Sequence, residues 1–160
     1  SSQAAQFRAM LARHMAGEPV AYITGEREFY GHVFQVSPAV LIPRPETELL
    51  VEWALEKIAP RAEARVLDLG TGSGCIAISI ACERPRAQVT AIDQGEAALE
   101  VARGNAQRHA PAHAPWCDAS PSWRSQIRRR HGHLHGPLKL WRAGLAPHHA
   151  SSPWGRDGFS

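Results

Sequence analysis

The chain has 160 residues, with 18 Lys and Arg, 15 Asp and Glu, and a formal net charge of +3. This length supports one domain with appendages and excludes two full domains. No apolar run approaches the roughly 20 residues that cross a bilayer, and no leader pattern is seen near the first residue, so a cytoplasmic protein without a membrane partner is expected. The cysteines, Cys75, Cys82 and Cys117, lack CxxC spacing, which disfavours a zinc site or a disulfide framework.

The basic charge belongs to the last third of the chain. Residues 1–109 contain 11 Lys and Arg against 13 Asp and Glu, whereas residues 110–160 contain 7 against 2. The net charge is therefore −2 in the first part and +5 in the second. An evenly basic surface, as on many nucleic-acid-binding domains, is not indicated.

The first part of the chain predicts a helix followed by a β-hairpin. Gly17 lies where a C-terminal cap would end the helix. Two short aromatic and β-branched runs, residues 28–30 and 33–36, flank Gly31-His32 and predict a hairpin with its turn there. The apolar stripe of the helix consists of Phe7, Met10, Leu11, His14 and Met15.

A second helix is predicted after a rigid, extended segment. Pro43 and Pro45 force an extended backbone, and Glu46 and Glu48 then open the helix, where acidic side chains suit the helix dipole. Its apolar residues are Leu49, Leu50, Trp53 and Ile58.

Two strand-helix units follow and predict the fold class. Residues 66–69 form an apolar strand, a glycine-rich turn follows, and residues 76–81 begin a helix. Residues 89–93 are a second strand ending in an acid, and residues 96–108 are a second amphipathic helix. This alternation predicts an α/β fold with a parallel, doubly wound sheet.

The glycine-rich turn is the motif that carries chemistry. Residues 68–74 read Asp-Leu-Gly-Thr-Gly-Ser-Gly and lie at the carboxyl edge of the predicted sheet, where such folds bind ligands. A dinucleotide site would require glycine at position 75, which is Cys75. The spacing therefore favours the amino-acid portion of S-adenosylmethionine over a pyrophosphate as the ligand. The alternative, that the glycines only allow the strand to join the helix for steric reasons, stays open. Asp68 is expected to orient the loop and not to act as a catalytic acid.

Asp93, at the end of the next strand, is placed to accept hydrogen bonds from ribose hydroxyls. A helix N-cap is the alternative role for this carboxylate. No metal ligands and no catalytic residues are assigned. The predicted cofactor-binding residues are Gly70, Thr71, Gly72, Ser73, Gly74 and Asp93.

Several of these segments together resemble the N5-glutamine methyltransferases that modify peptide chain release factors. The resemblance spans residues 17–107. It rests on residues 17–25, 28–31, 68–74 and 91–93, and above all on Leu-Ile-Pro-Arg-Pro-Glu-Thr-Glu at residues 41–48, a run specific to this family. The glycine loop is shared by class I methyltransferases generally.

The resemblance implies an incomplete, Rossmann-like class I methyltransferase domain. Residues 1–17 would end a helical N-terminal domain, 18–44 would form a β-hairpin linker, 45–109 the S-adenosylmethionine-binding half-domain, and 110–160 an aberrant or disordered tail. The family transfers a methyl group to the side-chain amide nitrogen of the glutamine in the release factor's Gly-Gly-Gln motif. Release factors are thus the expected partners, and a monomer is expected. Arg44 and Glu46 would help place cofactor or substrate, or only start a helix.

The family orients its amide substrate with an Asn-Pro-Pro-Tyr loop, and this sequence departs from the pattern there. It contains neither Asn-Pro nor Pro-Pro, and its only asparagine, Asn105, lies in the preceding helix. Periodicity also stops after His109, and residues 110–160 hold four of the five tryptophans and six of the nine histidines. These features favour an out-of-frame tail over a divergent tail or a splicing artefact.

Three other functions are weighed beside family methyl transfer. The chain could bind its cofactor without turnover, or belong to the related amino-methyltransferases that act on nucleic acid. The basic and aromatic residues of the tail could also form a nucleic-acid-binding arm, but out-of-frame coding explains them more simply. The histidines of the tail, His131, His133, His135, His148 and His149, lack the Cys or carboxylate partners of a metal site.

Overall fold

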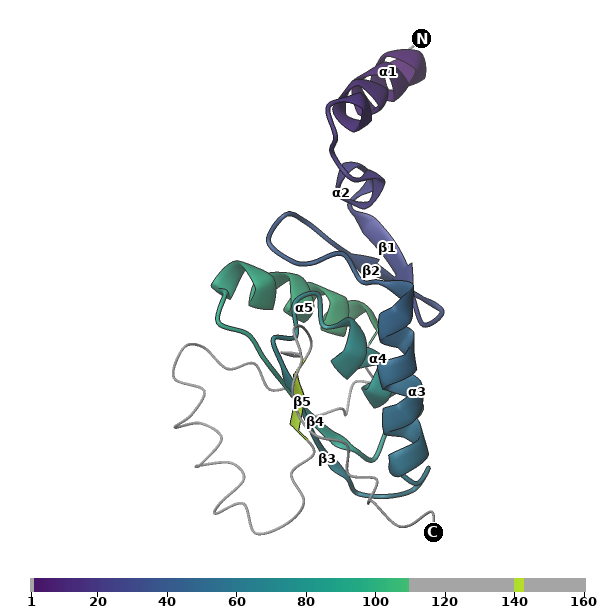
Figure 1. Cartoon of the computed structure of the whole chain (residues 1–160), viewed down its shortest axis with the longest axis vertical. Coiled ribbons are helices and arrows are strands. Elements are labelled where there is room, and N and C mark those ends of the chain that lie inside the picture. Colours follow the sequence, from purple (N-terminus) through teal and green to yellow (C-terminus); the bar gives the residue numbers. More distant parts are fainter. Residues whose placement is uncertain (1, 110–139, 143–160) are drawn as a thin grey trace, which may run out of the picture.

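The computed structural model describes residues 2–109 and 140–142 and shows an elongated N-terminal part joined to an α/β body (Figure 1). Within those residues, no helix is long and apolar enough to cross a membrane. The elements are α1 (Ser2–Met15), α2 (Val20–Thr24), β1 (Glu26–Phe29), β2 (His32–Gln35), the short 3₁₀ helix η1 (Pro45–Thr47), α3 (Glu48–Lys57), β3 (Arg65–Leu69), α4 (Cys75–Glu83), β4 (Gln88–Ile92), α5 (Glu96–His109) and β5 (Leu140–Arg142).

The body contains the predicted parallel sheet. Strands β3 and β4 pair in parallel, with Val66 opposite Val89 and Asp68 opposite Ala91. Helix α4 connects them, and it contacts α3 on one side and α5 on the other. Strand β5 pairs in parallel with the other edge of β3, which gives the order β4-β3-β5. The α/β fold class predicted from the sequence is confirmed.

Alternation along β3 decides which side chains enter the main core. Val66 is buried with α3, α4 and the hairpin, whereas Leu67 and Leu69 pack with Ile92 in a separate cluster. This is the two-residue period of a strand, which sends successive side chains to opposite faces. Asp68 therefore points to the same face as Val66, toward α4. Every residue of α4 from 75 to 81 is buried, so this helix is the centre of the body.

The hairpin forms one residue earlier along the chain than the sequence predicts. Phe29 pairs with His32, so the turn is Tyr30-Gly31 and not Gly31-His32. Tyr30 and Gly31 have φ of 49° and 73°, and positive φ at both positions is the signature of the type I′ turn that matches strand twist. Below the turn, the buried rings of Phe29 and Phe34 meet edge to face at 6.1 Å.

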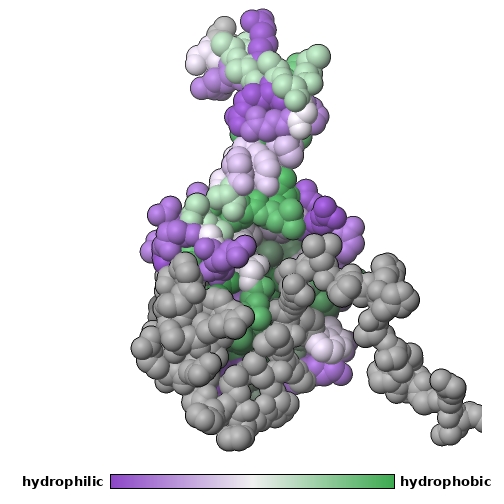
Figure 2. All heavy atoms as spheres, turned by 60° about the vertical axis from the view of Figure 1, so that its left-hand side comes forward, coloured by the Kyte–Doolittle hydropathy of each residue, from purple (hydrophilic) through white to green (hydrophobic). Residues whose placement is uncertain are grey.

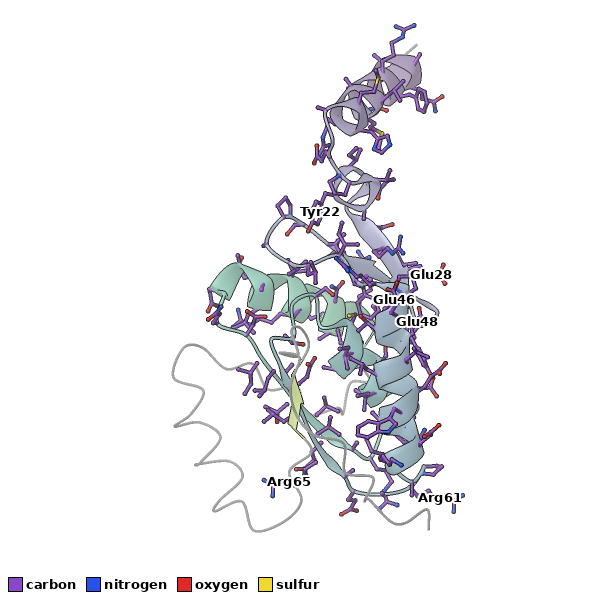
Figure 3. The ribbon with its side chains drawn as sticks, in the orientation of Figure 1. Tyr22, Glu28, Glu46, Glu48, Arg61 and Arg65 are labelled. Carbon is purple, nitrogen blue, oxygen red and sulfur yellow. The ribbon has the colours of Figure 1, made fainter. Side chains whose placement is uncertain are left out.

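Two side chains attach the hairpin region to its surroundings. Glu48, at the start of α3, accepts a hydrogen bond of 2.9 Å from the backbone N–H of Tyr30. Tyr22, in α2, donates its hydroxyl to the carbonyl oxygen of Val40 over 2.7 Å. Figure 3 shows Tyr22 toward the open end of the hairpin, and Glu46 and Glu48 toward its turn, near Glu28 of β1. The sequence did not predict α2, because five residues are too few for a helical period.

Helix α3 begins later and ends earlier than predicted. Its predicted first residue, Glu46, lies in η1, and α3 itself starts at Glu48. Ile58 was predicted to be helical, but its φ and ψ are −109° and 106°, which is extended backbone. Pro60 lies two residues further on and cannot donate the backbone hydrogen bond that another helical turn would need.

Helix α1 forms as predicted, but none of its residues is buried. Met15 is 81% exposed and Phe7 is 66% exposed, although both belong to the predicted apolar stripe. Figure 2 shows hydrophobic surface on this helix and again below α2. The stripe is therefore largely exposed in the described part of the chain, where α1 contacts α2.

Strand β5 departs from the expectation that no regular structure follows His109. Its backbone pairs with β3, with Trp141 opposite Asp68. The other predictions for the tail, namely the out-of-frame segments, the histidine group and the basic and aromatic arm, lie outside the described residues.

Candidate cofactor site

The glycine loop connects β3 to α4 and is tied to the end of the neighbouring strand. The backbone N–H groups of Gly70 and Thr71 both donate to the carbonyl oxygen of Ile92, over 2.7 Å and 2.9 Å. Ile92 is the last residue of β4. The loop thus lies across the carboxyl ends of two parallel strands, the edge at which open α/β sheets bind ligands.

The alternating glycines follow from the backbone conformation of the loop. Gly70, Gly72 and Gly74 have φ of 76°, 54° and 83°, in the left-handed region that other residues adopt only at a cost. A Cβ atom built on Gly70 or Gly72 would meet no atom within 4 Å. Conformation and not crowding therefore requires glycine at these two positions, and the space in front of them is open to a ligand.

Asp93 is bonded directly to this loop. Its Oδ2 accepts the N–H of Gly72 over 2.9 Å, and its Oδ1 accepts the N–H of Gly95 over 3.0 Å. Each carboxylate oxygen can accept more than one hydrogen bond, so both retain capacity for hydroxyl donors. The contact with Gly95 has the spacing of a local turn that precedes α5. The local role and the ligand role proposed for Asp93 are therefore compatible.

Asp68 lies buried beneath the loop. Its side chain is 2% exposed, and its Oδ2 accepts the hydroxyl of Thr71 over 2.8 Å. Its Oδ1 has no hydrogen-bond partner among the described residues. Burial raises the pKa of Asp68 to about 6, because the charged form loses its hydration. Hydrogen bonding by the Thr71 hydroxyl and the Ala77 backbone N–H opposes this rise, and the negative charge of Asp93 adds to it.

The structure separates the predicted site residues into two groups. Gly70, Gly72 and Asp93 have exposed or partly exposed positions at the edge of the sheet. The side chains of Thr71 and Ser73 are buried at 6% and 2% exposure, which leaves their backbone as the part nearest a ligand. Arg44 and Glu46 are exposed at η1 on the hairpin side of α3. In the part of the chain that is described, no three His, Cys, Asp or Glu side chains gather as a metal would require.

Asn105 is a contact of the loop that the sequence analysis missed. Its side chain is fully buried and donates from Nδ2 to the carbonyl oxygen of Ser73 over 2.9 Å. A signal was present, because Asn105 falls on the same helical face as the buried Ala98 and Ala102 of α5. A polar residue on a buried face indicates a hydrogen-bonded contact in the core.

The sequence matches two family models. The methyltransferase small domain matches residues 45–126, about half of the chain. The PrmC N-terminal domain matches residues 1–25.

Curated relatives carry one shared name. A release factor glutamine methyltransferase of Bordetella pertussis is 61% identical over 104 residues, which are 65% of this chain and 38% of that protein. One of Coxiella burnetii is 46% identical over 126 residues, or 76% of this chain and 46% of that protein. The chain thus spans less than half the length of these two relatives.

Among solved structures, an O-methyltransferase from Bacillus cereus is 17% identical with a TM-score of 0.48, over 63% of this chain and 44% of that one. The family matches and the curated relatives agree with the motifs at residues 41–48 and 68–74. The chain belongs to the methyltransferase small domain family, and it is similar to curated proteins named release factor glutamine methyltransferase.

Proposed function

We propose that the glycine loop and Asp93 hold S-adenosylmethionine, the methyl donor of this family. The observation that carries the proposal is the bond between Asp93 Oδ2 and the N–H of Gly72, which joins the two predicted binding features at one sheet edge. The open space in front of Gly70 and Gly72 suits close approach of a ligand to the backbone. When bound, this cofactor supplies a methyl group made electrophilic by its sulfonium.

The residues of this chain would bind and orient the cofactor. Asp93 offers acceptors for ribose hydroxyls, and the loop backbone lies where the amino-acid portion would pass. Thr71 and Asp68 hold the loop from below through their buried hydrogen bond. Orientation is the main contribution such a site makes, because the reacting atoms must be held in line before methyl transfer.

We further propose that the parent activity is methylation of the side-chain amide nitrogen of the glutamine in the Gly-Gly-Gln motif of release factors. The shared name of the relatives and the segment at residues 41–48 support this substrate. Release factors would then be the partners, in the cytoplasm where they act. An amide nitrogen is a weak nucleophile, so positioning must supply much of the rate. No residue of this chain is assigned as catalytic.

A second candidate function is cofactor binding without methyl transfer. It is favoured by the sequence itself, which contains no Asn-Pro-Pro-Tyr run to hold the amide nitrogen in line. Sequencing the coding DNA for residues 105–160 would help to decide between these two functions. An Asn-Pro-Pro-Tyr codon run in a neighbouring frame would assign the tail to a lesion in a methyltransferase gene.

Calorimetric titration of the chain with S-adenosylhomocysteine tests the binding proposal. We expect saturable binding to the wild type and about 10- to 100-fold weaker binding to Asp93→Ala, since a hydrogen bond to a charged group contributes about 1.5–3 kcal/mol. Glu100→Gln is the matched control, because Glu100 is an exposed carboxylate on α5. Equal affinity of all three proteins would refute the proposed site.

A second assay separates the two candidate functions. The chain is incubated with radiolabelled S-adenosylmethionine and a release factor, beside the same factor with the Gly-Gly-Gln glutamine replaced by alanine. Label on the first factor alone supports methyl transfer. Cofactor binding with no label on either factor supports the second candidate.

A further inference from the structure

The side chain of Asn105 connects two parts of the molecule that are far apart in sequence. Its Oδ1 accepts the backbone N–H of Gln35 over 2.7 Å, and its Nδ2 donates to the carbonyl oxygen of Gln35 over 2.9 Å. The second hydrogen of Nδ2 reaches the carbonyl oxygen of Ser73, also at 2.9 Å. Gln35 ends strand β2, and Ser73 lies between Gly72 and Gly74 in the glycine loop, which we also term the cofactor loop.

These bonds use the special donor and acceptor set of a carboxamide. One oxygen acceptor and two N–H donors are all engaged, and Asn105 is fully buried. Toward Gln35 the amide acts as a short piece of neighbouring strand, because it pairs with both backbone groups of that residue. Asparagine is a poor helix former, so its place within α5 is one that tertiary contacts stabilise.

One helical turn further along α5, a second side chain contacts the same strand. His109 Nε2 lies 2.7 Å from the carbonyl oxygen of Val33, and the His109 ring lies 5.4 Å from that of Phe34. Thus α5 attaches to β2 at two points. Of these two residues, Asn105 also donates a hydrogen bond to the loop, at the carbonyl oxygen of Ser73.

Loss of the Asn105 amide would leave three backbone groups without this partner, namely the N–H and carbonyl oxygen of Gln35 and the buried carbonyl oxygen of Ser73. Because the same amide holds Ser73 and Gln35, a displacement of either one disturbs the bond to the other. The hairpin and the cofactor loop therefore share one rigid connection in the core.

We infer that Asn105 is a positioning residue that couples the β1–β2 hairpin to the cofactor loop, so that a ligand on the loop also orders the hairpin at Gln35. The identity of that ligand rests on the proposed function above. Such coupling is reciprocal, because any constraint that orders the hairpin must tighten ligand binding by the same factor.

Titration with S-adenosylhomocysteine tests the coupling in three forms of the full chain. Asn105→Ala should bind about tenfold more weakly than the wild type, a loss within the usual range of coupling between sites. The matched control is His109→Ala, which removes the other attachment of β2 and leaves the loop contact in place. It should lower the thermal midpoint and leave the dissociation constant within about twofold. All titrations are made well below the midpoint, where circular dichroism shows a folded chain.

Hydrogen exchange of the wild type supplies a measurement that needs no variant. The amide of Gln35 should exchange more slowly when S-adenosylhomocysteine is saturating, and Asn105→Ala should lose this protection while the amide of Gly72 keeps its own. Equal affinities of wild type and Asn105→Ala, equal losses in both variants, or no ligand effect at Gln35 would overturn the coupling alone. Failure of the wild type to bind would overturn the proposed function and the coupling together.

Discussion

Asp68 makes the stability of this protein depend on pH in a direction opposite to that of most paired carboxylates. Burial raises the pKa of Asp68 from 3.8 to about 6. Between these values the folded protein keeps a proton that the unfolded chain has released. The free energy of unfolding therefore falls as the pH rises through this window, and the loss is complete above the folded-state pKa.

The size of the effect follows from the shift. Each pKa unit corresponds to about 1.4 kcal/mol, so a rise from 3.8 to about 6 costs the folded state about 3 kcal/mol at neutral pH. Asp68→Asn keeps the shape of the side chain and cannot ionise. The variant should gain about 2–2.5 kcal/mol relative to the wild type as the pH rises from about 4 to about 7.

Urea unfolding, followed by circular dichroism at several pH values, measures this difference. Subtracting the free energy of unfolding of the wild type from that of the variant removes the contributions of the titrating groups that both proteins share. Glu100→Gln is the control, and its difference should stay constant with pH, because Glu100 is exposed. A difference between Asp68→Asn and the wild type that does not change from about pH 4 to about pH 7 would refute the argument.

Three further predictions concern the loop and the core. Gly72→Ala should lower the free energy of unfolding by about 1–2 kcal/mol, because φ is 54° there. It should also weaken the binding of S-adenosylhomocysteine in calorimetry, because the added methyl group enters the open space. Arg84 donates to two carbonyl oxygens at the end of α3, so Arg84→Ala should lower the free energy of unfolding in urea by about 2 kcal/mol. Arg86 forms an exposed ion pair, so Arg86→Ala should lower it by less than about 1 kcal/mol. Burial raises the pKa of the Cys75 thiol to about 12, so peptide mapping should find it alkylated at pH ~8 only after unfolding, and rapid alkylation in the native state would contradict its burial.

Several elements could be predicted from the sequence because local patterns carry them. The apolar runs in β3 and β4 and the helical period of α5 are strong over their full length, and the glycines at 70, 72 and 74 mark the loop. The division at residues 17, 44 and 109 and the cofactor role of the loop stay predictions. The turn of the hairpin was misplaced by one residue, because Tyr30 is an unusual residue for positive φ.

By itself the sequence determined the α/β class, the order of the strand-helix units and the family, since each depends on residues near one another in the chain. Only the tertiary structure placed Asp93 on the N–H of Gly72, buried Asp68 beneath the loop, and brought Asn105 to both Ser73 and Gln35. These contacts join segments that are far apart in sequence, so their closeness in space cannot be read from the sequence. Their energies come from burial and hydrogen-bond geometry, which a linear pattern of apolar and polar residues does not contain.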